Sequence, residues 1–225
     1  FEEQVRFRLN TAKKVSFPLY LRIPGWCKQA SVELNGKKLD LNAPAGTFVK
    51  LDREWNNNDA LVLNLPMEMT CTTWQVNQNS VSVSYGPLTF SLKIDEEYQK
   101  ISSTASAISD SKWQKNADPE KWPAYQIEAK SAWNYGLLID EQKPASAFEL
   151  LRKPWPADDY PFTAKSVPIE IRTRGKKIPS WCIDRFGLVD VLPSYPAQTN
   201  EKAEDLTLIP MGAARLRISA FPLVQ

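Results

Sequence analysis

Apolar side chains recur at every second position through most of the first hundred residues, which is the pattern of β-strands with one buried face. This alternation predicts strands over Val5–Leu9, Phe17–Ile23, Val32–Leu34, Phe48–Trp55, Leu61–Met69, Val81–Tyr85 and Leu88–Leu92. Only one face of each strand is apolar, and no amphipathic helix separates them. The pattern therefore favours an antiparallel sandwich over a parallel sheet.

Turn residues punctuate these strands. Asn35-Gly36 predicts a tight hairpin, because a type I′ turn needs two residues with positive φ. Pro66 falls on the outward phase of its strand, which suits an edge strand or a bulge. The alternation changes phase at Gly86-Pro87, where we expect a bulge or a sharp bend.

The pattern changes near residue 95. Residues 95–118 are polar, without a clear period, and form either a linker or a long surface excursion. Strand signals then return, between proline-rich loops, at Tyr125–Ala129, Trp133–Ile139, Phe148–Leu151, Val167–Ile171, Leu206–Ile209 and Leu216–Ala220. The sequence thus predicts an all-β protein of two antiparallel, jelly-roll-like β-sandwich domains in tandem, residues 1–97 and a looser 98–225.

One short segment occurs twice. Arg22–Cys27 (Arg-Ile-Pro-Gly-Trp-Cys) is echoed by Lys177–Cys182 (Lys-Ile-Pro-Ser-Trp-Cys). Either both domains share a tryptophan plug at the end of a strand, or the similarity is chance, since no longer repeat accompanies it.

Composition excludes several chemistries. The 225 residues contain no histidine, which rules out Ser-His-Asp triads, Cys-His dyads and zinc sites with imidazole ligands. The eight glycines form neither of the common phosphate-binding loops. A net charge of +2 gives no general attraction to nucleic acid or to anionic lipid. We therefore expect no cofactor, no metal, no nucleic-acid partner and no membrane partner.

The three cysteines, Cys27, Cys71 and Cys182, are too few and too far apart for a disulfide framework or a metal clip. Small buried side chains are one interpretation, and a bridge between Cys27 and Cys71 is another. The chain has no apolar run of the ~20 residues that cross a bilayer. It begins at Phe1 without an initiator methionine or a signal peptide, which suggests a processed or excised piece.

Charged groups give no clear catalytic site. A pair of carboxylates can hydrolyse glycosides, but the acidic clusters Glu2-Glu3, Asp95–Glu97 and Asp158-Asp159 lie in polar stretches, typical of solvated surface. No catalytic residue is assigned. The basic cluster Arg172–Lys177 indicates either a phosphate or polysaccharide contact, or the charged tip of a hairpin on an edge strand.

Tryptophan is the more suggestive residue type, since sugars stack their C–H faces on exposed indoles. Trp113, Trp122 and Trp155 fall in predicted loops and are the candidate substrate-binding residues, although loop indoles also fill seams between domains. Four others lie beside predicted strands and are expected to plug the sandwiches: Trp26, Trp55, Trp133 and Trp181.

An ordered set of motifs resembles the region after the catalytic domain in glycoside hydrolase family 127, the β-L-arabinofuranosidase family. The set spans nearly the whole chain: Leu21–Trp26, Val32–Gly36, Phe48–Trp55, Tyr85–Leu88, Trp133–Leu137, Leu208–Gly212 and Leu216–Pro222. Within the closing segment, Met211 and Ala213 depart from the residues common in the family.

The resemblance implies two accessory β-sandwich domains that follow an (α/α)6 catalytic barrel. In that family a nucleophilic cysteine and a zinc site belong to the barrel, and none of their motifs occurs here. The implied partner is the barrel of the same parent chain, with a glycan as a second, and a periplasmic or extracellular parent is favoured. The isolated chain is then expected to be inactive. A carbohydrate-binding module and a structural or adhesion sandwich are the alternatives.

Overall fold

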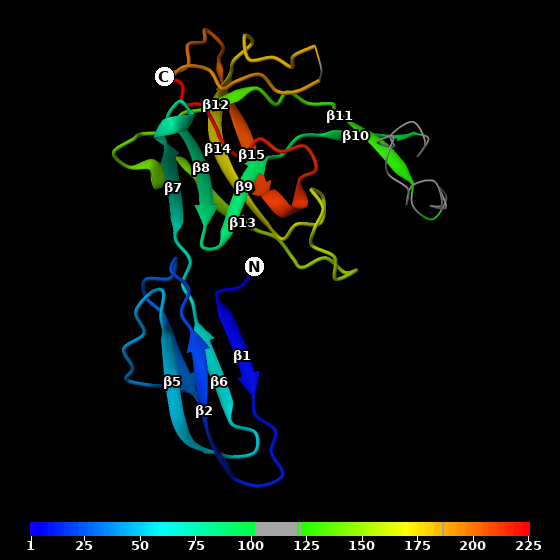
Figure 1. Ribbon diagram of the computed structural model, residues 1–225. Coiled ribbons are helices and arrows are strands. Elements are labelled where there is room, and N and C mark those ends of the chain that lie inside the picture. Colours follow the sequence, from blue (N-terminus) through cyan, green and yellow to red (C-terminus); the bar gives the residue numbers. More distant parts are fainter. Residues whose placement is uncertain (102–120, 122, 186) are drawn as a thin grey trace, which may run out of the picture. The chain divides into compact units, whose positions relative to one another are not determined.

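The computed structural model describes residues 1–101, 121, 123–185 and 187–225 (Figure 1). Over this part of the chain, the regular structure is β-strand with short 3-10 turns at η1 (Gln75–Asn77), η3 (Pro144–Ala147) and η4 (Met211–Ala213). The predicted all-β class with antiparallel sheets is confirmed. In the same residues, no helix has the length and apolar character to cross a membrane.

The chain forms two compact units. The N-terminal unit comprises residues 1–71 and 83–89, and the C-terminal unit comprises residues 72–82 and 90–225. The chain therefore passes between the units three times, and each passage falls within a strand. The ranges 1–97 and 98–225 stay a prediction about which parts of the chain fold independently.

Six strands build most of the N-terminal unit: β1 (Gln4–Arg8), β2 (Val15–Arg22), β3 (Ser31–Leu34), β4 (Lys37–Lys38), β5 (Phe48–Trp55) and β6 (Ala60–Asn64). One antiparallel sheet has the order β1-β6-β3-β4, and β2 pairs with β5 in a second. The buried core draws side chains from both sheets: Leu21, Ile23, Val32, Leu34, Val49, Leu51, Trp55, Leu61 and Leu63. The unit is therefore a small sandwich whose core follows the predicted period of two.

The tight turn is confirmed at Asn35-Gly36, where φ is +51° and +77°. The Asn35 side chain also accepts a hydrogen bond from the Ala60 amide at 2.8 Å and donates one to Asp59 at 2.9 Å. The hairpin is thus tied to the start of β6 by its own turn residue.

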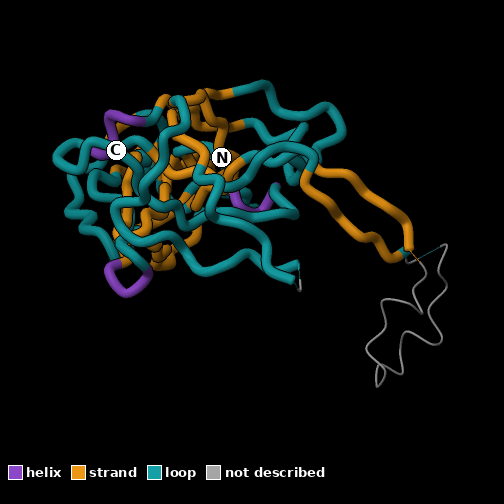
Figure 2. Tube along the Cα trace, turned by 90° about the horizontal axis from the view of Figure 1, so that it is seen from above, coloured by secondary structure: helices purple, strands orange, loops and turns teal. Residues whose placement is uncertain are grey.

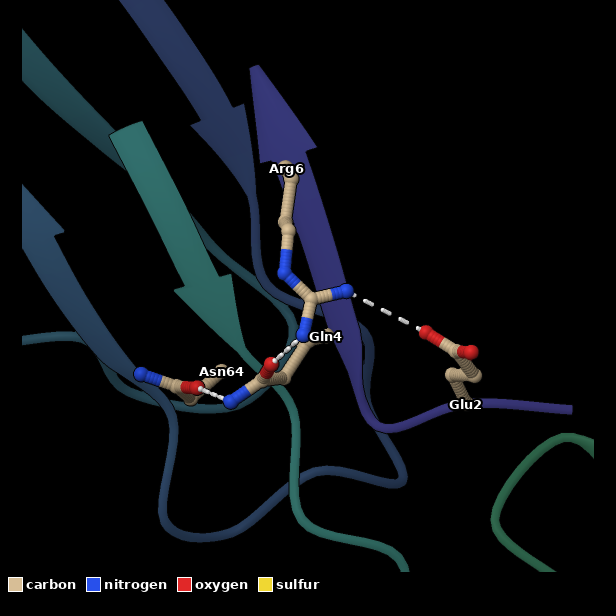
Figure 3. A network of polar contacts seen from close by, with 4 residues as sticks. All are labelled: Glu2, Gln4, Arg6 and Asn64. Carbon is tan, nitrogen blue, oxygen red and sulfur yellow. Dashed lines mark hydrogen bonds and ion pairs between the residues drawn. The ribbon is translucent and has the colours of Figure 1, made fainter. Parts of the chain in front are cut away.

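The outer edge of this sheet is polar. Gln4 on β1 donates a hydrogen bond to Asn64 on β6 at 2.7 Å, and Arg6 contacts both Gln4 and Glu2 (Figure 3). All of these contacts are exposed, so they add little stability. Their charges guard an edge strand against pairing with other chains.

The long alternation predicted over Leu61–Met69 is interrupted. Strand β6 ends at Asn64, and β7 (Met69–Trp74) begins as a separate strand after Pro66. Proline cannot donate to a ladder, which accounts for the break. The bend at Gly86-Pro87 is a hairpin turn between β8 (Ser80–Tyr85) and β9 (Leu88–Leu92), as expected.

The C-terminal unit contains a seven-stranded sheet and a two-stranded ribbon. The sheet has the order β12-β14-β15-β9-β8-β7, and β13 also pairs with β14. Its other strands are β12 (Tyr135–Leu137), β13 (Glu149–Arg152), β14 (Ile169–Lys177) and β15 (Ala203–Pro210). The ribbon, β10 (Glu96–Ile101) with β11 (Ala124–Ala129), extends away from the sheet of its unit (Figure 1, Figure 2).

Two predictions for this unit are wrong. Residues 96–101, placed in a polar linker or excursion, form strand β10, whose exposed side chains lack the alternation of a half-buried strand. Residues 216–220 do not form a strand. The Ile218 carbonyl accepts the Leu92 amide at 2.9 Å, and the neighbouring Phe221 makes only a single bridge, to Val81.

Candidate functional site

Of the three predicted sugar-binding tryptophans, only Trp155 can be placed. Trp113 and Trp122 lie outside the described residues. Trp155 lies on the connection between β13 and β14, residues 153–168, which we call the aromatic loop. Its side chain is 52% exposed, as the loop prediction requires.

A tight turn within the aromatic loop orients this indole. The Trp155 Nε1–H donates to Asp159 Oδ1 at 2.6 Å, and the Asp159 amide donates back to the Pro156 carbonyl at 3.1 Å. Asp159 has φ of +56°, a left-handed conformation that aspartate tolerates better than most residues. The Asp158 carboxylate accepts the Tyr160 amide at 3.1 Å. The acidic pair Asp158-Asp159 therefore shapes the loop.

Two further aromatic side chains share the loop. Tyr160 and Phe162 are 47% and 50% exposed, and their ring centroids lie 5.6 Å apart at an interplanar angle of 75°. The edge-to-face contact is a favourable aromatic geometry, but it gives no flat surface. Sequence reasoning missed this pair, although the spacing Tyr-Pro-Phe beside Trp155 was a signal for an aromatic cluster.

A backbone hydrogen bond and an ion pair join the two ends of the aromatic loop. The Lys153 amide donates to the Pro168 carbonyl at 2.7 Å, and Lys153 Nζ lies 2.6 Å from Glu170 Oε1. Lys93 Nζ, on the segment after β9, contacts the same oxygen at 2.8 Å. The Glu170 side chain is almost fully buried between the two ammonium groups.

Burial alone would raise the pKa of Glu170, but the hydrogen bonds and charges of Lys153 and Lys93 outweigh it and hold the pKa below its usual value. The carboxylate is therefore ionised at neutral pH. We interpret this triad as an anchor for the aromatic loop, since it holds the two ends of the loop together.

The other predicted clusters have structural contacts. Glu2 pairs with Arg6, and Glu96 accepts the backbone amides of Arg215 and Leu216, each at 2.9 Å. The basic cluster Arg172–Lys177 lies within β14, which has neighbours on both edges, so the predicted hairpin tip on an edge strand is wrong.

Two of the three cysteines, Cys27 and Cys71, have the character of inert thiols. Burial raises the pKa of Cys27, and it raises that of Cys71 to about 11. Cys182 is exposed and its Sγ donates to the Pro179 carbonyl at 3.2 Å. All three are free, and in the part of the chain that the structure describes no three acidic or cysteine side chains gather as metal ligands.

Two of the predicted plugs are buried. The Trp55 indole is fully enclosed and donates to the Phe17 carbonyl at 2.9 Å. Trp181 is also buried, and its ring packs edge-to-face on half-buried Trp133 at 5.2 Å. The buried indoles of Trp55 and Trp181 therefore stabilise the units rather than line a binding surface. Among the described residues, the candidate for a binding site is thus the aromatic loop on the surface.

One known protein family matches the N-terminal part of the chain. Residues 1–67 match the family described as beta-L-arabinofuranosidase, GH127 middle domain. Comparison with curated protein sequences finds no match.

Solved structures resemble the whole chain. A glycoside hydrolase matches with a TM-score of 0.57 and 20% identity, over 100% of this chain and 31% of its own. A GH127 β-L-arabinofuranosidase from Geobacillus stearothermophilus T6 matches with a TM-score of 0.54 and 20% identity, over 99% and 28%. A GH127 β-arabinofuranosidase matches with a TM-score of 0.55 and 16% identity, over 98% and 30%.

At these identities the likeness shows the fold, and the chain spans 28–31% of the length of the three solved chains. The sequence match and the fold point to the same enzymes, so the resemblance drawn from the motifs is confirmed. Residues 1–67 match the middle domain of glycoside hydrolase family 127, and the chain as a whole has the fold of part of these solved chains.

Proposed function

We propose that this chain is a non-catalytic β-sandwich region of a glycoside hydrolase that acts on arabinofuranoside-containing glycans. Its role is to brace the (α/α)6 catalytic barrel of that enzyme. The observation that carries the proposal is the match of residues 1–67 to the GH127 middle domain. The three solved chains extend well beyond the part this chain covers, which leaves room for a separate catalytic domain in the proteins it resembles.

The chemistry of the chain supports a non-catalytic role. It has no histidine, its buried thiols have raised pKa values, and its acidic clusters are engaged in loop and strand contacts. A glycosidase needs a carboxylic acid held in an enclosed setting that raises its pKa. The two acids with buried side chains among the described residues, Asp59 and Glu170, both have their pKa lowered instead.

The aromatic loop supports a bracing role. Trp155, Tyr160 and Phe162 expose about half of each side chain, and burying such area stabilises by about 25 cal/mol per Å². Because the loop is anchored at its base, it should lose little conformational entropy when its aromatic rings pack against the barrel. We propose that the loop packs against the barrel at the rim of its substrate cleft.

Mixing experiments test this role. The chain is combined with a separately produced GH127 barrel, and complex formation is measured by analytical ultracentrifugation. We expect a complex that raises the thermal midpoint of the barrel, and a triple variant (Trp155→Ser, Tyr160→Ser, Phe162→Ser) that weakens it. Phe48→Ser is the control, because Phe48 is 64% exposed on β5 of the other unit. Absence of both the complex and the thermal shift would refute the bracing role.

Carbohydrate binding by the loop is the second candidate function. The half-exposed indole of Trp155 favours it, whereas the perpendicular rings of Tyr160 and Phe162 do not extend it into a flat platform. Calorimetry with arabinan oligosaccharides tests it: binding that disappears in Trp155→Ala would support this role, and unchanged binding would argue against it.

A further inference from the structure

A groove of about 600 Å³ lies on the seven-stranded sheet of the C-terminal unit, at a different place from the aromatic loop. Its walls come from the end of η3, the start of β13, and facing stretches of β14 and β15. The side chains that define its chemistry are Ser146, Phe148, Glu149, Arg172, Arg174 and Asp205. The volume is in the range of sites that hold small ligands.

The groove forms where one edge of β14 changes partner. Along this edge β13 pairs as far as Arg172, opposite Glu149, and β12 begins at Gly175, opposite Leu137. The other edge of β14 is occupied by β15 throughout this stretch. On this edge only Thr173 therefore lacks a strand partner, because the Leu138 amide donates to the Arg174 carbonyl at 3.0 Å. The chain leading from η3 into β13 leaves a hollow beside Thr173.

The exposed side chains of β14 face this hollow. Arg172 and Arg174 alternate with buried neighbours, so they share one face of the strand. In register, Glu149 lies opposite Arg172 on one side, and Asp205 lies opposite Arg174 on the other. Two cations and two anions thus surround the groove, and its net charge is zero.

These charges are largely unengaged. Neither the Arg172 nor the Glu149 side chain has an ion-pair or hydrogen-bond partner among the residues that the structure describes, although they are cross-strand neighbours. Arg174 and Asp205 are 3.8 Å apart and well exposed, a separation typical of a weak pair. The groove therefore offers a free donor, Arg172, and a free acceptor, Glu149, beside the weak pair of Arg174 and Asp205.

Thr173 lies between the two arginines, so its side chain points to the other, buried face of β14. Thr173, which also lines the groove, is buried, and its Oγ1 has no hydrogen-bond partner. Such groups are rare in folded proteins and call for a physical explanation. Because this hydroxyl is buried on that face, it is not among the groups that the groove offers to a ligand.

We propose that this groove binds a neutral oligosaccharide. Sugar hydroxyls donate to carboxylates and accept from guanidinium groups, so a vicinal diol satisfies Glu149 and Arg172 together. The half-buried ring of Phe148 supplies an apolar wall for the C–H face of a sugar. An anion would gain from the arginines but would be repelled by Glu149 and Asp205, which is why a neutral ligand is favoured.

This inference goes beyond the bracing role, because the groove needs no barrel to bind. It also gives the basic cluster of β14 a function that differs from that of the loop tryptophans. The two proposals can be refuted independently. Complex formation with a barrel tests the bracing role, and oligosaccharide binding by this chain alone tests the groove.

The experiment is an NMR titration of the ¹⁵N-labelled chain with neutral oligosaccharides of arabinose, xylose and galactose. Galacturonate oligosaccharide and inorganic phosphate serve as anionic probes. We expect at least one neutral oligosaccharide to shift the amide signals of residues 146–149, 172–174 and 205–207. Arg172→Gln and Glu149→Gln should each raise its dissociation constant about tenfold.

Matched controls separate a local effect from lost charge or misfolding. Arg152→Gln removes the same charge from β13, and strand alternation places Arg152 on the opposite face from Glu149. It should bind normally, and all variants should keep the wild-type thermal midpoint.

Three results would each overturn the proposal. The first is no shift with any neutral probe up to about 10 mM. The second is binding of the anionic probes alone. The third is binding lost in Trp155→Ala but retained in Arg172→Gln, which would place the sugar on the aromatic loop.

Discussion

The ammonium group of Lys153 lies 2.6 Å from Oε1 of Glu170, and the backbone amide of the same lysine donates to the Pro168 carbonyl. One residue thus joins both ends of the aromatic loop, by its main chain and by its charge. The Glu170 side chain is almost fully buried, so the contact is shielded from solvent far better than the surface ion pairs of the protein.

Replacing Glu170 with Gln should destabilise the C-terminal unit by about 2 kcal/mol, because two ammonium groups lose a charged acceptor. The free energy of unfolding, measured with guanidinium chloride, checks this. Glu201→Gln, an exposed glutamate in the same unit, should change it by less than about 0.5 kcal/mol.

The same contact makes stability depend on pH. The pKa of Glu170 is lower in the folded chain than its usual value of 4.5. Its contribution is therefore complete above that value and is lost as pH falls toward the folded pKa. Between about pH 5 and pH 3 the wild type should lose stability more steeply than Glu170→Gln. Parallel curves over that range would show that Glu170 carries no such linkage.

The N-terminal unit should depend on one indole. Trp55 is fully buried and donates to the Phe17 carbonyl, so Trp55→Ala should cost about 3–5 kcal/mol through lost packing. Phe48→Ala on the same strand should have little effect, since Phe48 is 64% exposed. Denaturant unfolding of both variants checks this, and equal losses would contradict the assigned faces of β5.

Thiol labelling should distinguish the three cysteines. At pH 8 only exposed Cys182 should react rapidly with a disulfide reagent, because Cys27 is buried and the pKa of Cys71 is about 11. Cys182→Ser should remove the fast phase. After denaturation without reductant all three thiols should react, and a single reactive thiol would reveal a bridge between Cys27 and Cys71.

The predictable part of the fold was the part with one buried face. Leu21 and Val49 are cross-strand partners in the core, and both were expected from the period of two along their own strands. Strand β10 was missed because none of its side chains is fully buried and its three exposed positions are consecutive, so its sequence carries no alternation. Pairing with β11, more than twenty residues away, is what makes it a strand.

In the candidate site, too, contacts between residues close in sequence could be predicted, and contacts between residues far apart in sequence could not. Trp155, Tyr160 and Phe162 are close in sequence, so their shared loop could be read from the chain. The triad of Lys93, Lys153 and Glu170 could not, because it joins residues up to 77 positions apart. A glutamate inside a run of apolar residues gives no sign of which lysines will reach it.

The two copies of the repeated segment, Arg22–Cys27 and Lys177–Cys182, are similar in sequence but differ in the structure of their turns. Ile23 and Ile178 both follow the last residue of a strand and both are fully buried. The turn then begins at Pro24 in the first copy, with the Cys27 amide donating to Pro24, but at Ile178 in the second, with the Trp181 amide donating to Ile178. This shift of one residue buries Cys27 in the first copy and Trp181 in the second.

The function proposed above requires that this chain carries no glycosidase chemistry of its own. The most direct measurement is hydrolysis of an aryl β-L-arabinofuranoside by the purified chain, with a GH127 enzyme as the positive control. The account predicts no release of the aryl group above the buffer blank. Turnover that co-purifies with the chain through successive columns would contradict it.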